Sequence, residues 1–385
     1  MHSKEAGKRP RVGIISIHPA PYRDATFAAL HRRGVIDATI VTLFDSDRRH
    51  TFWDLETAAY RNIDLGKHYR LYGDSCFHPR ILSVLRRERF DVILLPGYYY
   101  VTLWVVLIYC LLTRTPFIFS TDKIGDRPSS RIRKLLASRI APWVLRTASG
   151  FWIPGKATRQ YLHKQAIEDK RLFEGSYNLD YFAIRDQVER CRETRSNIRQ
   201  DFSIDENAFL FLMMANVEPK RRHDLLLESF SRVLLECPDA HLLVVGKGTD
   251  RDTMARLTRG KEIKNVILSG PVPFGDLPAL YAASDAYIHS GAEAYSTSVA
   301  YAAIAGLPII ASSEVGATHD YVVDGETGYA VGAKDVCGFA EKMKMLTQDR
   351  ELAKSQGCRV AELSSRFTSD WAAEQFENAV ALALE

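Results

Sequence analysis

No Cys-x-x-Cys pair occurs among the six cysteines, which are scattered singly along the 385 residues. This spacing excludes a zinc ribbon and a thioredoxin-like redox motif, and it predicts reduced thiols in a cytosolic protein. The first twenty residues also lack an apolar core followed by small residues, so we expect no export signal there. His18, His78, His289 and His319 have no partner at metal-ligand spacing, and we predict no metal site.

Long hydrophobic runs are also scarce. The apolar stretch Tyr98–Leu112 carries no charge and has 15 residues, fewer than the roughly 20 that span a bilayer. Pro96 and Gly97 precede it and Arg114 follows it. We therefore expect a helix buried against a sheet rather than a membrane span.

Charge is unevenly distributed along the chain. Residues 1–200 carry 34 Lys and Arg against 20 Asp and Glu, whereas residues 201–385 carry 17 against 27. A basic half indicates an anionic partner, such as nucleic acid, a membrane surface or a phosphorylated substrate. Solvated helix faces are the alternative explanation. The basic segment 127–146 also has an apolar stripe. It is either an interfacial helix on anionic lipid or a helix whose apolar stripe packs on the sheet and whose basic face is solvated.

Apolar strand-like segments alternate with helix-like segments in both halves. This alternation predicts parallel sheets covered by helices on both faces. The highly charged segment 183–204 separates the halves and is expected to be a connection between two domains. A helical tail follows residue 335. The expected strands are 11–17, 38–44, 91–97, 116–121 and 150–155 in the first half, and 209–217, 241–246, 265–270, 286–291 and 307–312 in the second.

The segment 290–315 holds the most informative local pattern. Glu293 lies in a loop after an expected strand, and Ser296 and Thr297 begin a helix that ends at Gly306. A helix N-terminus presents free N–H groups and partial positive charge, so it binds phosphate. A carboxylate beside it suits sugar hydroxyls or a developing positive charge. An ordinary helix cap beside a solvated glutamate remains the alternative.

This segment resembles the motif E-x-F-G-x-x-x-x-E-A-x-x-x-G-x-P of the family 4 retaining glycosyltransferases. Glu293, Tyr295, Gly306 and Pro308 are in register with it. The resemblance implies the GT-B fold, an α/β architecture of two Rossmann-like domains with parallel sheets facing a central cleft. It implies an acceptor-side domain over residues 1–190, a donor-side domain over 191–365, and a C-terminal helix over 366–385 for which we consider packing on the first domain.

Two residues depart from the family motif. Ser296 replaces a glycine, and Tyr301 replaces the second glutamate. In the family the second glutamate accepts hydrogen bonds from both ribose hydroxyls of the nucleotide, whereas a phenol offers one such bond and no charge. The first glutamate, which contacts the donor sugar in the family, is retained as Glu293.

The segment 214–230 resembles the family segment that holds the donor diphosphate. In this register Arg221 occupies the position at which the family usually has a lysine, and Lys220 lies beside it. Asn216 occupies the position at which the family frequently has an arginine. A fixed cation stabilises the charge that the leaving diphosphate gains. Basic residues at a helix start oppose the helix dipole, which favours this role over a solvated helix start.

Other donor and acceptor positions follow from the resemblance. Gly246 opens a glycine-containing turn near the expected cleft, and Val272 lies in the loop whose backbone meets the nucleotide base. In the first domain, Arg23 follows the first strand and is assigned to phosphate or acceptor. Asp122 lies near the family's sugar-contacting histidine and is assigned to orient an acceptor hydroxyl. A surface role for Arg23 and a turn cap for Asp122 are the alternatives.

The resemblance implies a retaining, metal-independent transferase without a cofactor, which moves a sugar from a nucleotide-diphosphate sugar to an acceptor hydroxyl. Polysaccharide or glycolipid assembly at the inner face of the membrane, with a lipid-linked acceptor and peripheral contact with anionic lipid, is the expected setting. A non-catalytic GT-B protein that binds nucleotide sugars is the main alternative. A nucleic-acid binder is disfavoured because no nucleic-acid motif accompanies the basic residues.

Overall fold

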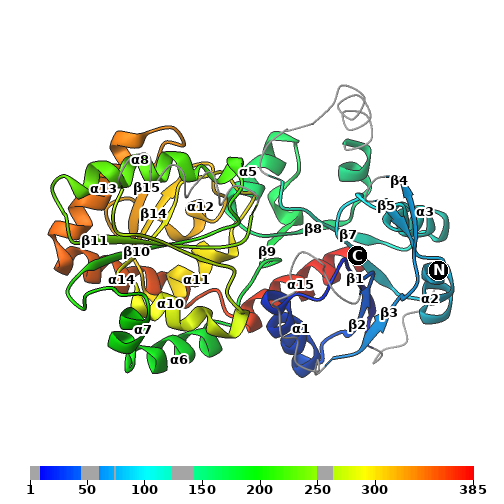
Figure 1. Cartoon of the computed structure of the whole chain (residues 1–385). Helices are drawn as coiled ribbons and strands as arrows, with labels where there is room; N and C mark the ends of the chain where they lie inside the picture. The colour runs from blue at the N-terminus through cyan, green and yellow to red at the C-terminus, as the bar shows by residue number, and fades with distance from the viewer. Residues whose placement is uncertain (1–8, 45–59, 73–74, 124–141, 249–262) are drawn as a thin grey trace. The chain divides into compact units, whose positions relative to one another are not determined.

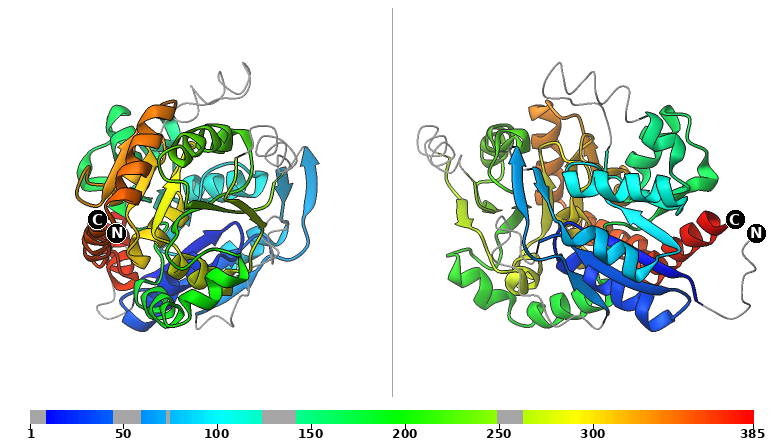
Figure 2. Two further views of the ribbon diagram at one scale, coloured as in Figure 1. Left: turned by 60° about the vertical axis from the view of Figure 1, so that its left-hand side comes forward. Right: turned by 90° about the vertical axis from the view of Figure 1, so that its right-hand side faces the viewer.

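The computed structural model describes residues 9–44, 60–72, 75–123, 142–248 and 263–385. The chain forms two compact units. Unit 1 comprises Met1–Pro154, Thr158–Asn178 and Ser369–Glu385, and unit 2 comprises Gly155–Ala157 and Leu179–Thr368. In each unit, helices cover a central sheet (Figures 1 and 2).

Unit 1 contains a seven-stranded sheet of order β3-β2-β1-β6-β7-β8-β9, and every neighbouring pair is parallel. Its strands are nearly continuous apolar runs because both faces are covered. The sheet consists of β1 (Arg11–Ser16), β2 (Asp37–Thr42), β3 (Asn62–Asp64), β6 (Val92–Leu95), β7 (Phe117–Ser120), β8 (Gly150–Ile153) and β9 (Leu172–Glu174).

The helices of unit 1 divide between two core clusters, one on each face of the sheet. One cluster includes residues of α2 (Arg80–Glu88), α3 (Val101–Thr113) and α5 (Lys156–Lys164), and the other includes α1 (Pro21–Arg33). A separate antiparallel pair, β4 (Tyr69–Tyr72) and β5 (Ser75–Phe77), precedes α2. The one-turn helix η1 (Asp169–Arg171) precedes β9.

The last helix of the chain, α15 (Ser369–Leu384), belongs to unit 1. The ring centroids of Phe376 and Trp152 lie 4.8 Å apart. Glu377 forms an ion pair with Arg33 of α1, with Nη2 and Oε2 2.9 Å apart. Aromatic packing and a largely buried ion pair therefore hold the end of the chain on this sheet.

The helix expected over residues 98–112 is confirmed as α3, but it is buried on one face only. Leu103, Val106 and Leu107 are buried, whereas Ile108 and Leu112 are exposed. Among the helices that the structure describes, none is long and apolar enough to cross a membrane.

Unit 2 contains a six-stranded parallel sheet of order β12-β11-β10-β13-β14-β15. Its strands are β10 (Phe209–Met214), β11 (Ala240–Val245), β12 (Val266–Gly270), β13 (Ala286–His289), β14 (Ile309–Ser312) and β15 (Gly328–Val331). Its helices include η2 (Pro219–Arg221), α8 (His223–Leu234), η3 (Phe274–Asp276), α10 (Leu277–Ala283), α11 (Thr297–Ala305), α12 (Thr318–Tyr321), α13 (Val336–Gln348) and α14 (Arg350–Ser364).

The expectation of a plain connection over residues 183–204 is wrong. This segment lies in α6 (Tyr181–Arg192) and α7 (Arg195–Asp201), both in unit 2. Ile184 and Val188 bury one face of α6 at a spacing of four residues. Arg199, only 1% exposed, donates to four backbone carbonyls and to Asp285. A buried and hydrogen-bonded arginine therefore anchors this segment, although its high content of charged residues is typical of solvent-exposed sequence.

Most of the basic segment 127–146 falls outside the described residues. Residues 142–147, at its end, are helical.

Strand order determines where each sheet opens at its carboxyl edge. The order reverses between β10 and β13 in unit 2, and between β1 and β6 in unit 1. Loops diverge at such a point, and ligands of open parallel sheets bind there. In unit 2 these loops carry Arg221 and Glu293, and in unit 1 the loop after β1 leads to Arg23.

Candidate active site

The two residues that unit 2 presents at its switch point form a two-pronged ion pair. Arg221 Nη1 lies 2.6 Å from Glu293 Oε2, and Arg221 Nη2 lies 2.6 Å from Glu293 Oε1. The residue Arg221 is 9% exposed and the Glu293 side chain is 26% exposed. Parallel N–H···O bonds to one carboxylate fix both planes and make this contact stronger than a single-point pair.

His289, at the end of β13, completes this cluster. Its Nε2 lies 3.2 Å from Glu293 Oε2, and its Nδ1 accepts the Gly291 N–H at 3.4 Å. Nδ1 therefore acts as the acceptor, so Nε2 carries the proton and donates to the carboxylate. From the sequence, His289 was considered only as a metal ligand, and this role was not predicted. Its position four residues before Glu293, at a strand end, is the signal that points to it.

These neighbours keep Glu293 ionised. Burial raises the pKa of its carboxyl group, but His289 and Arg221 together outweigh burial and lower that pKa to about 2. Since this value lies below the ordinary one, the pair stabilises the fold at neutral pH and loses that contribution as the pH falls toward 2. At neutral pH the site therefore holds a fixed negative charge beside a fixed positive one.

The loops after β10 and β13 are locked to each other. A Cβ atom on Gly291 would lie only 2.3 Å from Arg221 Cα, so only glycine permits this approach. Ser290 Oγ donates to Arg221 O at 3.1 Å, and the Ala292 N–H donates to Lys220 O at 3.0 Å. The backbone therefore positions the ion pair before any ligand arrives.

Lys220 and Arg221, adjacent in sequence, have different environments. The Lys220 side chain is 59% exposed, and its Nζ lies 2.9 Å from Glu218 Oε2. Arg221 Nε is buried and has no hydrogen-bond partner among the described residues. A buried unpaired N–H group is unfavourable, and a bound anion would satisfy it. Of the two cations, Arg221 is therefore the one that keeps a buried donor available for a bound anion.

Ser296 precedes α11 in a strained conformation, with φ 91° and ψ 95°. Its Oγ lies 3.0 Å from Ser298 Oγ, which also contacts the Tyr287 hydroxyl at 2.8 Å. A side chain at positive φ is costly unless its surroundings enforce it, and such residues cluster at functional sites. These hydroxyl contacts hold Ser296, at the position where the family has glycine, beside the backbone N–H group of Thr297.

Replacement of Ser296 tests this strain. Ser296→Gly should raise the free energy of unfolding by about 1 kcal/mol, because relief of the backbone exceeds the lost hydroxyl contact. Ser296→Ala is the matched control, since it keeps the strain and loses the contact, and it should lower stability. Urea unfolding of the three proteins measures both changes. Equal destabilisation by Gly and Ala would mean that the backbone is unstrained.

Gly246 and Val272 flank the same edge of the sheet. Gly246 follows β11 with φ 154°, and a Cβ atom there would lie 2.1 Å from Ala215 O. This close approach of the loops after β10 and β11 requires glycine. Val272 is half-buried in the loop between β12 and η3.

Tyr301 lies in the second turn of α11 and is 3% exposed. Its ring stacks on Tyr281 of α10, with centroids 4.3 Å apart and planes 16° apart. Burial raises the pKa of its hydroxyl group. Packing therefore accounts for the aromatic ring at this position, and the ribose contact assigned to the hydroxyl stays a prediction.

Unit 1 brings Arg23 and Asp122 into one cluster through Tyr177. The Tyr177 hydroxyl donates to Asp122 Oδ2 at 3.4 Å. The Arg23 guanidinium lies 5.2 Å from the centroid of the Tyr177 ring and 5.6 Å from that of Tyr22. Arg23 Nε is buried without a hydrogen-bond partner among the described residues. Tyr177 was given no role from the sequence.

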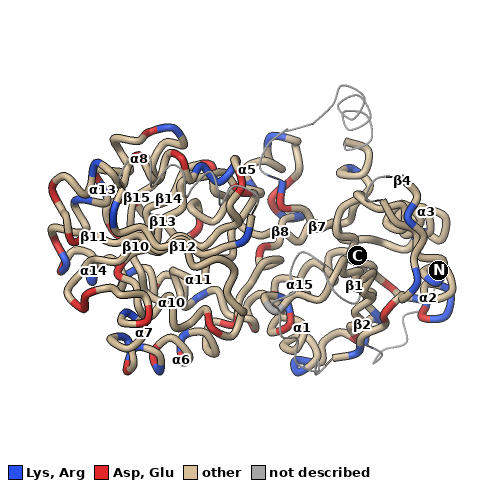
Figure 3. Tube along the Cα trace, in the orientation of Figure 1, with Lys and Arg blue, Asp and Glu red and all other residues tan. Residues whose placement is uncertain are grey.

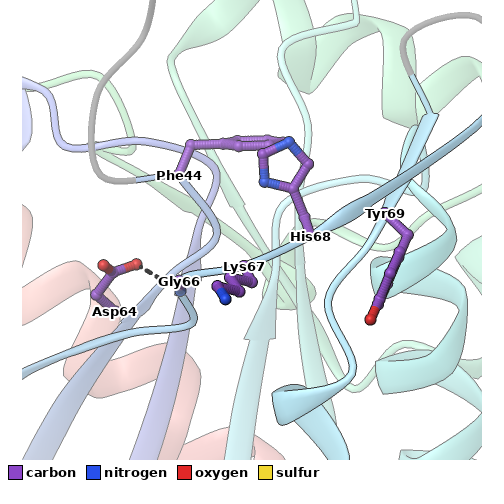
Figure 4. A pocket seen from close by; sticks show the side chains of 6 residues that line it. All are labelled: Phe44, Asp64, Gly66, Lys67, His68 and Tyr69. Atoms are coloured by element: carbon purple, nitrogen blue, oxygen red, sulfur yellow. Dashed lines mark hydrogen bonds between the residues drawn. The ribbon is translucent and has the colours of Figure 1, made fainter.

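A separate pocket of about 420 Å³ opens in unit 1 beside the carboxyl ends of β2 and β3. Figure 4 shows Phe44 and His68 together on one side of it, and their ring centroids lie 5.0 Å apart in an edge-to-face contact. The remaining lining residues are Asp64, Gly66, Lys67 and Tyr69. The lining thus combines aromatic faces with one carboxylate and one ammonium group.

Two Rossmann-like units with parallel sheets are the architecture of the GT-B glycosyltransferase fold. The second unit carries the Arg221–Glu293 pair at its switch point. Two family models match the chain. The "Glycosyl transferase 4-like domain" matches residues 19–173, and "Glycosyl transferases group 1" matches residues 194–360. The chain belongs to the family 4 glycosyltransferases of GT-B type.

Curated relatives are distant. The N-acetyl-alpha-D-glucosaminyl L-malate synthase of Bacillus anthracis is 26% identical over 185 residues, which is 47% of this chain and 48% of the relative. The D-inositol 3-phosphate glycosyltransferase of Geodermatophilus obscurus is 25% identical over 61% of this chain and 52% of the relative. A GDP-mannose-dependent phosphatidylinositol monomannoside mannosyltransferase of Mycolicibacterium smegmatis is 23% identical over 43% and 45%. The chain spans about half the length of these relatives.

Solved structures share the fold over nearly the whole chain. HepE of Anabaena, in complex with UDP and glucose, has a TM-score of 0.72 and 16% identity, and the match covers 96% of this chain and 99% of HepE. The sucrose-phosphate synthase of Thermosynechococcus elongatus has a TM-score of 0.71 and 16% identity, with 96% and 97% covered.

Proposed function

We propose that the protein is a retaining glycosyltransferase that moves a sugar from a nucleotide-diphosphate sugar to an acceptor hydroxyl. The observation that carries the proposal is the Arg221–Glu293 pair at the β10/β13 switch point. It places a cation for a leaving diphosphate beside a carboxylate for the sugar that the diphosphate leaves. The family and its nucleotide-bound structural relatives support the same chemistry.

Binding of the donor is assigned to unit 2. Arg221, with its unpaired Nε, contacts the diphosphate, and Lys220 approaches from the exposed side. The N–H groups at Ser296 and Thr297 add the dipole of α11. Val272 meets the base and Gly246 leaves room for the backbone around the nucleotide. These cationic and N–H groups supply the charge stabilisation for which other transferases use a metal, so we propose metal-independent transfer, unaffected by a chelator.

The chemical step separates charge within the donor. As the bond between sugar and phosphate breaks, the diphosphate gains negative charge, which Arg221 stabilises, and the sugar gains positive charge, which Glu293 stabilises. The acceptor oxygen attacks the anomeric carbon from the face that the diphosphate leaves, which retains the anomeric configuration, and the acceptor proton passes to the departing phosphate oxygen. Glu293 stays ionised because Arg221 and His289 lower the pKa of its carboxyl group.

Acceptor binding is assigned to unit 1. Asp122 accepts a hydrogen bond from the acceptor hydroxyl, and Tyr177 holds Asp122 in place. Arg23, with its buried unpaired Nε, binds a phosphate on the acceptor. This pairing suits an acceptor that carries both a hydroxyl and an anionic group.

A lipid-linked acceptor at the inner face of the cytoplasmic membrane fits this assignment. The basic first half of the chain is attracted to anionic lipid. One relative is, by name, a transferase that acts on a phosphatidylinositol monomannoside. We propose a role in the assembly of a glycolipid or a cell-surface polysaccharide.

A panel of nucleotides tests donor binding. Thermal melting of the protein with UDP, GDP, dTDP or ADP should show a raised melting temperature for one base, because a ligand of the native state stabilises it. Arg221→Lys should reduce that shift. No shift with any of the four would contradict the donor assignment.

The second candidate, a non-catalytic nucleotide-sugar-binding protein, is favoured by one observation, the tyrosine in place of the second glutamate. If the Tyr301 hydroxyl binds ribose, Tyr301→Phe should weaken nucleotide binding by about 0.5–1.5 kcal/mol. Tyr301→Glu should retain or improve binding. Titration calorimetry measures these affinities. Equal nucleotide affinity of the wild type and Tyr301→Phe would mean that Tyr301 serves only to pack the helices.

A further inference from the structure

The outer face of α3 is apolar and uncovered. Ile108 is 51% exposed, Leu111 36% and Leu112 80%. Trp104 and Val105, one turn earlier on the same side, are half-buried. Surface helices of soluble proteins normally place charged side chains on this face, whereas α3 has none from Val101 to Thr113. Contiguous exposed apolar surface of this kind marks an interaction site.

Positive charge flanks this face. Arg114 caps the end of α3, Arg86 lies in the last turn of the adjacent α2, and Arg89 caps the end of α2; all three are exposed. The Tyr109 hydroxyl of α3 donates to Leu85 O of α2 at 3.2 Å, so the two helices are direct neighbours. Figure 3 shows the basic residues of α2 beside α3. Arg87 pairs with Glu88, but in the described part of the chain Arg86, Arg89 and Arg114 form no ion pair.

No acidic residue occurs from Val92 to Thr121. We infer that α3, with Arg86, Arg89 and Arg114, is the surface by which unit 1 docks on an anionic lipid bilayer. The exposed side chains of Ile108, Leu111 and Leu112 and the half-buried Trp104 would enter the interface between headgroups and acyl chains, and the arginines would contact lipid phosphates. With its 13 residues, at about 1.5 Å per residue, α3 is too short to cross the roughly 30 Å core of a bilayer, so it lies in the interface.

A second copy of the chain fits this surface poorly. A two-fold contact through α3 would bring each set of arginines toward its own copy, because such interfaces use the same patch on both partners. Like charges at an interface are repulsive. Lipid phosphate offers the opposite charge on every side of the helix.

This docking would serve the proposed transfer to a lipid-linked acceptor, and its biological role depends on that proposed function. The loop that leads into α3 leaves the carboxyl edge of β6, and Asp122 follows the adjacent β7 at the same edge. Ile108, Leu111 and Leu112 lie in the last two turns of α3, toward the amino edge where β7 begins. Docking would therefore hold unit 1 on the membrane that contains a lipid-linked acceptor, and it would not press the acceptor cluster itself against the headgroups. Docking itself requires no catalysis and is measured separately.

Vesicle co-sedimentation with the full chain tests the inference. Wild-type protein should bind vesicles of phosphatidylcholine with phosphatidylglycerol, release them as salt is raised, and bind pure phosphatidylcholine weakly. Ile108→Gln with Leu112→Gln should lower partitioning at least about tenfold, since several buried methylene groups are lost. Leu235→Gln, an 85% exposed leucine in unit 2, is the matched control and should bind as wild type does.

Two further readouts separate docking from folding and from donor chemistry. Brominated lipids should quench Trp104, and Trp104→Phe should lose that part of the quenching. The double variant should keep the wild-type melting temperature and its shift with nucleotide. Unchanged vesicle binding by the double variant, no binding by wild type at low salt, or a stable dimer that dissociates on mutation of α3 would each overturn the inference.

Discussion

Glu293→Gln should lower the turnover number by at least about tenfold, equivalent to about 1.4 kcal/mol of transition-state stabilisation. The substitution keeps the size of the side chain but removes the charge that faces the developing positive charge on the sugar. Because that charge develops only in the transition state, nucleotide affinity should change little. Steady-state transfer and nucleotide titration on the same preparation measure both quantities.

A control for Glu293→Gln needs a carboxylate of the same unit outside the site. Glu326 is exposed in the turn before β15, and Glu326→Gln should leave turnover unchanged. Because the neutral amide pairs less well with Arg221 and His289, the melting temperature of Glu293→Gln should also fall. Wild-type turnover in Glu293→Gln would remove Glu293 from the chemistry.

Arg221→Lys should raise the donor KM and lower kcat together, with kcat/KM reduced by about one to two orders of magnitude. Lysine keeps the charge but cannot form two parallel bonds to Glu293 while a third donor faces the diphosphate. Loss of one hydrogen bond to a charged group costs about 1.5–3 kcal/mol. Arg221→Ala should lower kcat/KM further than Arg221→Lys and should also lower the stability of the fold, since it leaves the Glu293 carboxylate without its main partner.

Lys220→Met is the matched control for Arg221→Lys. The Lys220 side chain is 59% exposed and pairs with Glu218, and exposed pairs of this kind contribute about 0–1 kcal/mol. Its effect on kcat/KM should therefore stay below about fivefold. A larger loss for Lys220→Met than for Arg221→Lys would reverse the assignment of the diphosphate contact.

The parallel sheets were predictable from the sequence, because their strands are apolar runs with no polar alternation. Short strands were not predictable. β3, with the sequence Asn-Ile-Asp, has one buried residue and two exposed ones, so no local pattern separates it from a loop. Its place comes from pairing with β2 over long range.

Charge misled the prediction for α6 and α7. A segment rich in arginine and glutamate is typical of a solvated connection, yet Arg199 is buried because five oxygen acceptors from the polypeptide surround it. These acceptors come from residues up to 86 positions away. Local sequence therefore contains no sign of this burial.

The candidate site was predictable to the extent that a motif marks it. Glu293 and Arg221 were named from register, but their bidentate contact depends on the strand order that places β10 beside β13. His289 and Tyr177 were missed, because each acts through a neighbour that only the fold supplies. The packing of Tyr301 on Tyr281 likewise joins two helices whose contact no spacing predicts.

The most direct test of the central claim is turnover of a labelled donor. Wild-type protein and Glu293→Gln are incubated with radiolabelled nucleotide sugars, with and without a membrane extract as the acceptor source, and the label in free sugar and in extracted product is counted. The proposal predicts that wild type releases or transfers label from one donor, and that Glu293→Gln does so at least about ten times more slowly. A donor that binds wild type tightly but is neither hydrolysed nor transferred would contradict it, and would identify a nucleotide-sugar-binding protein without catalysis.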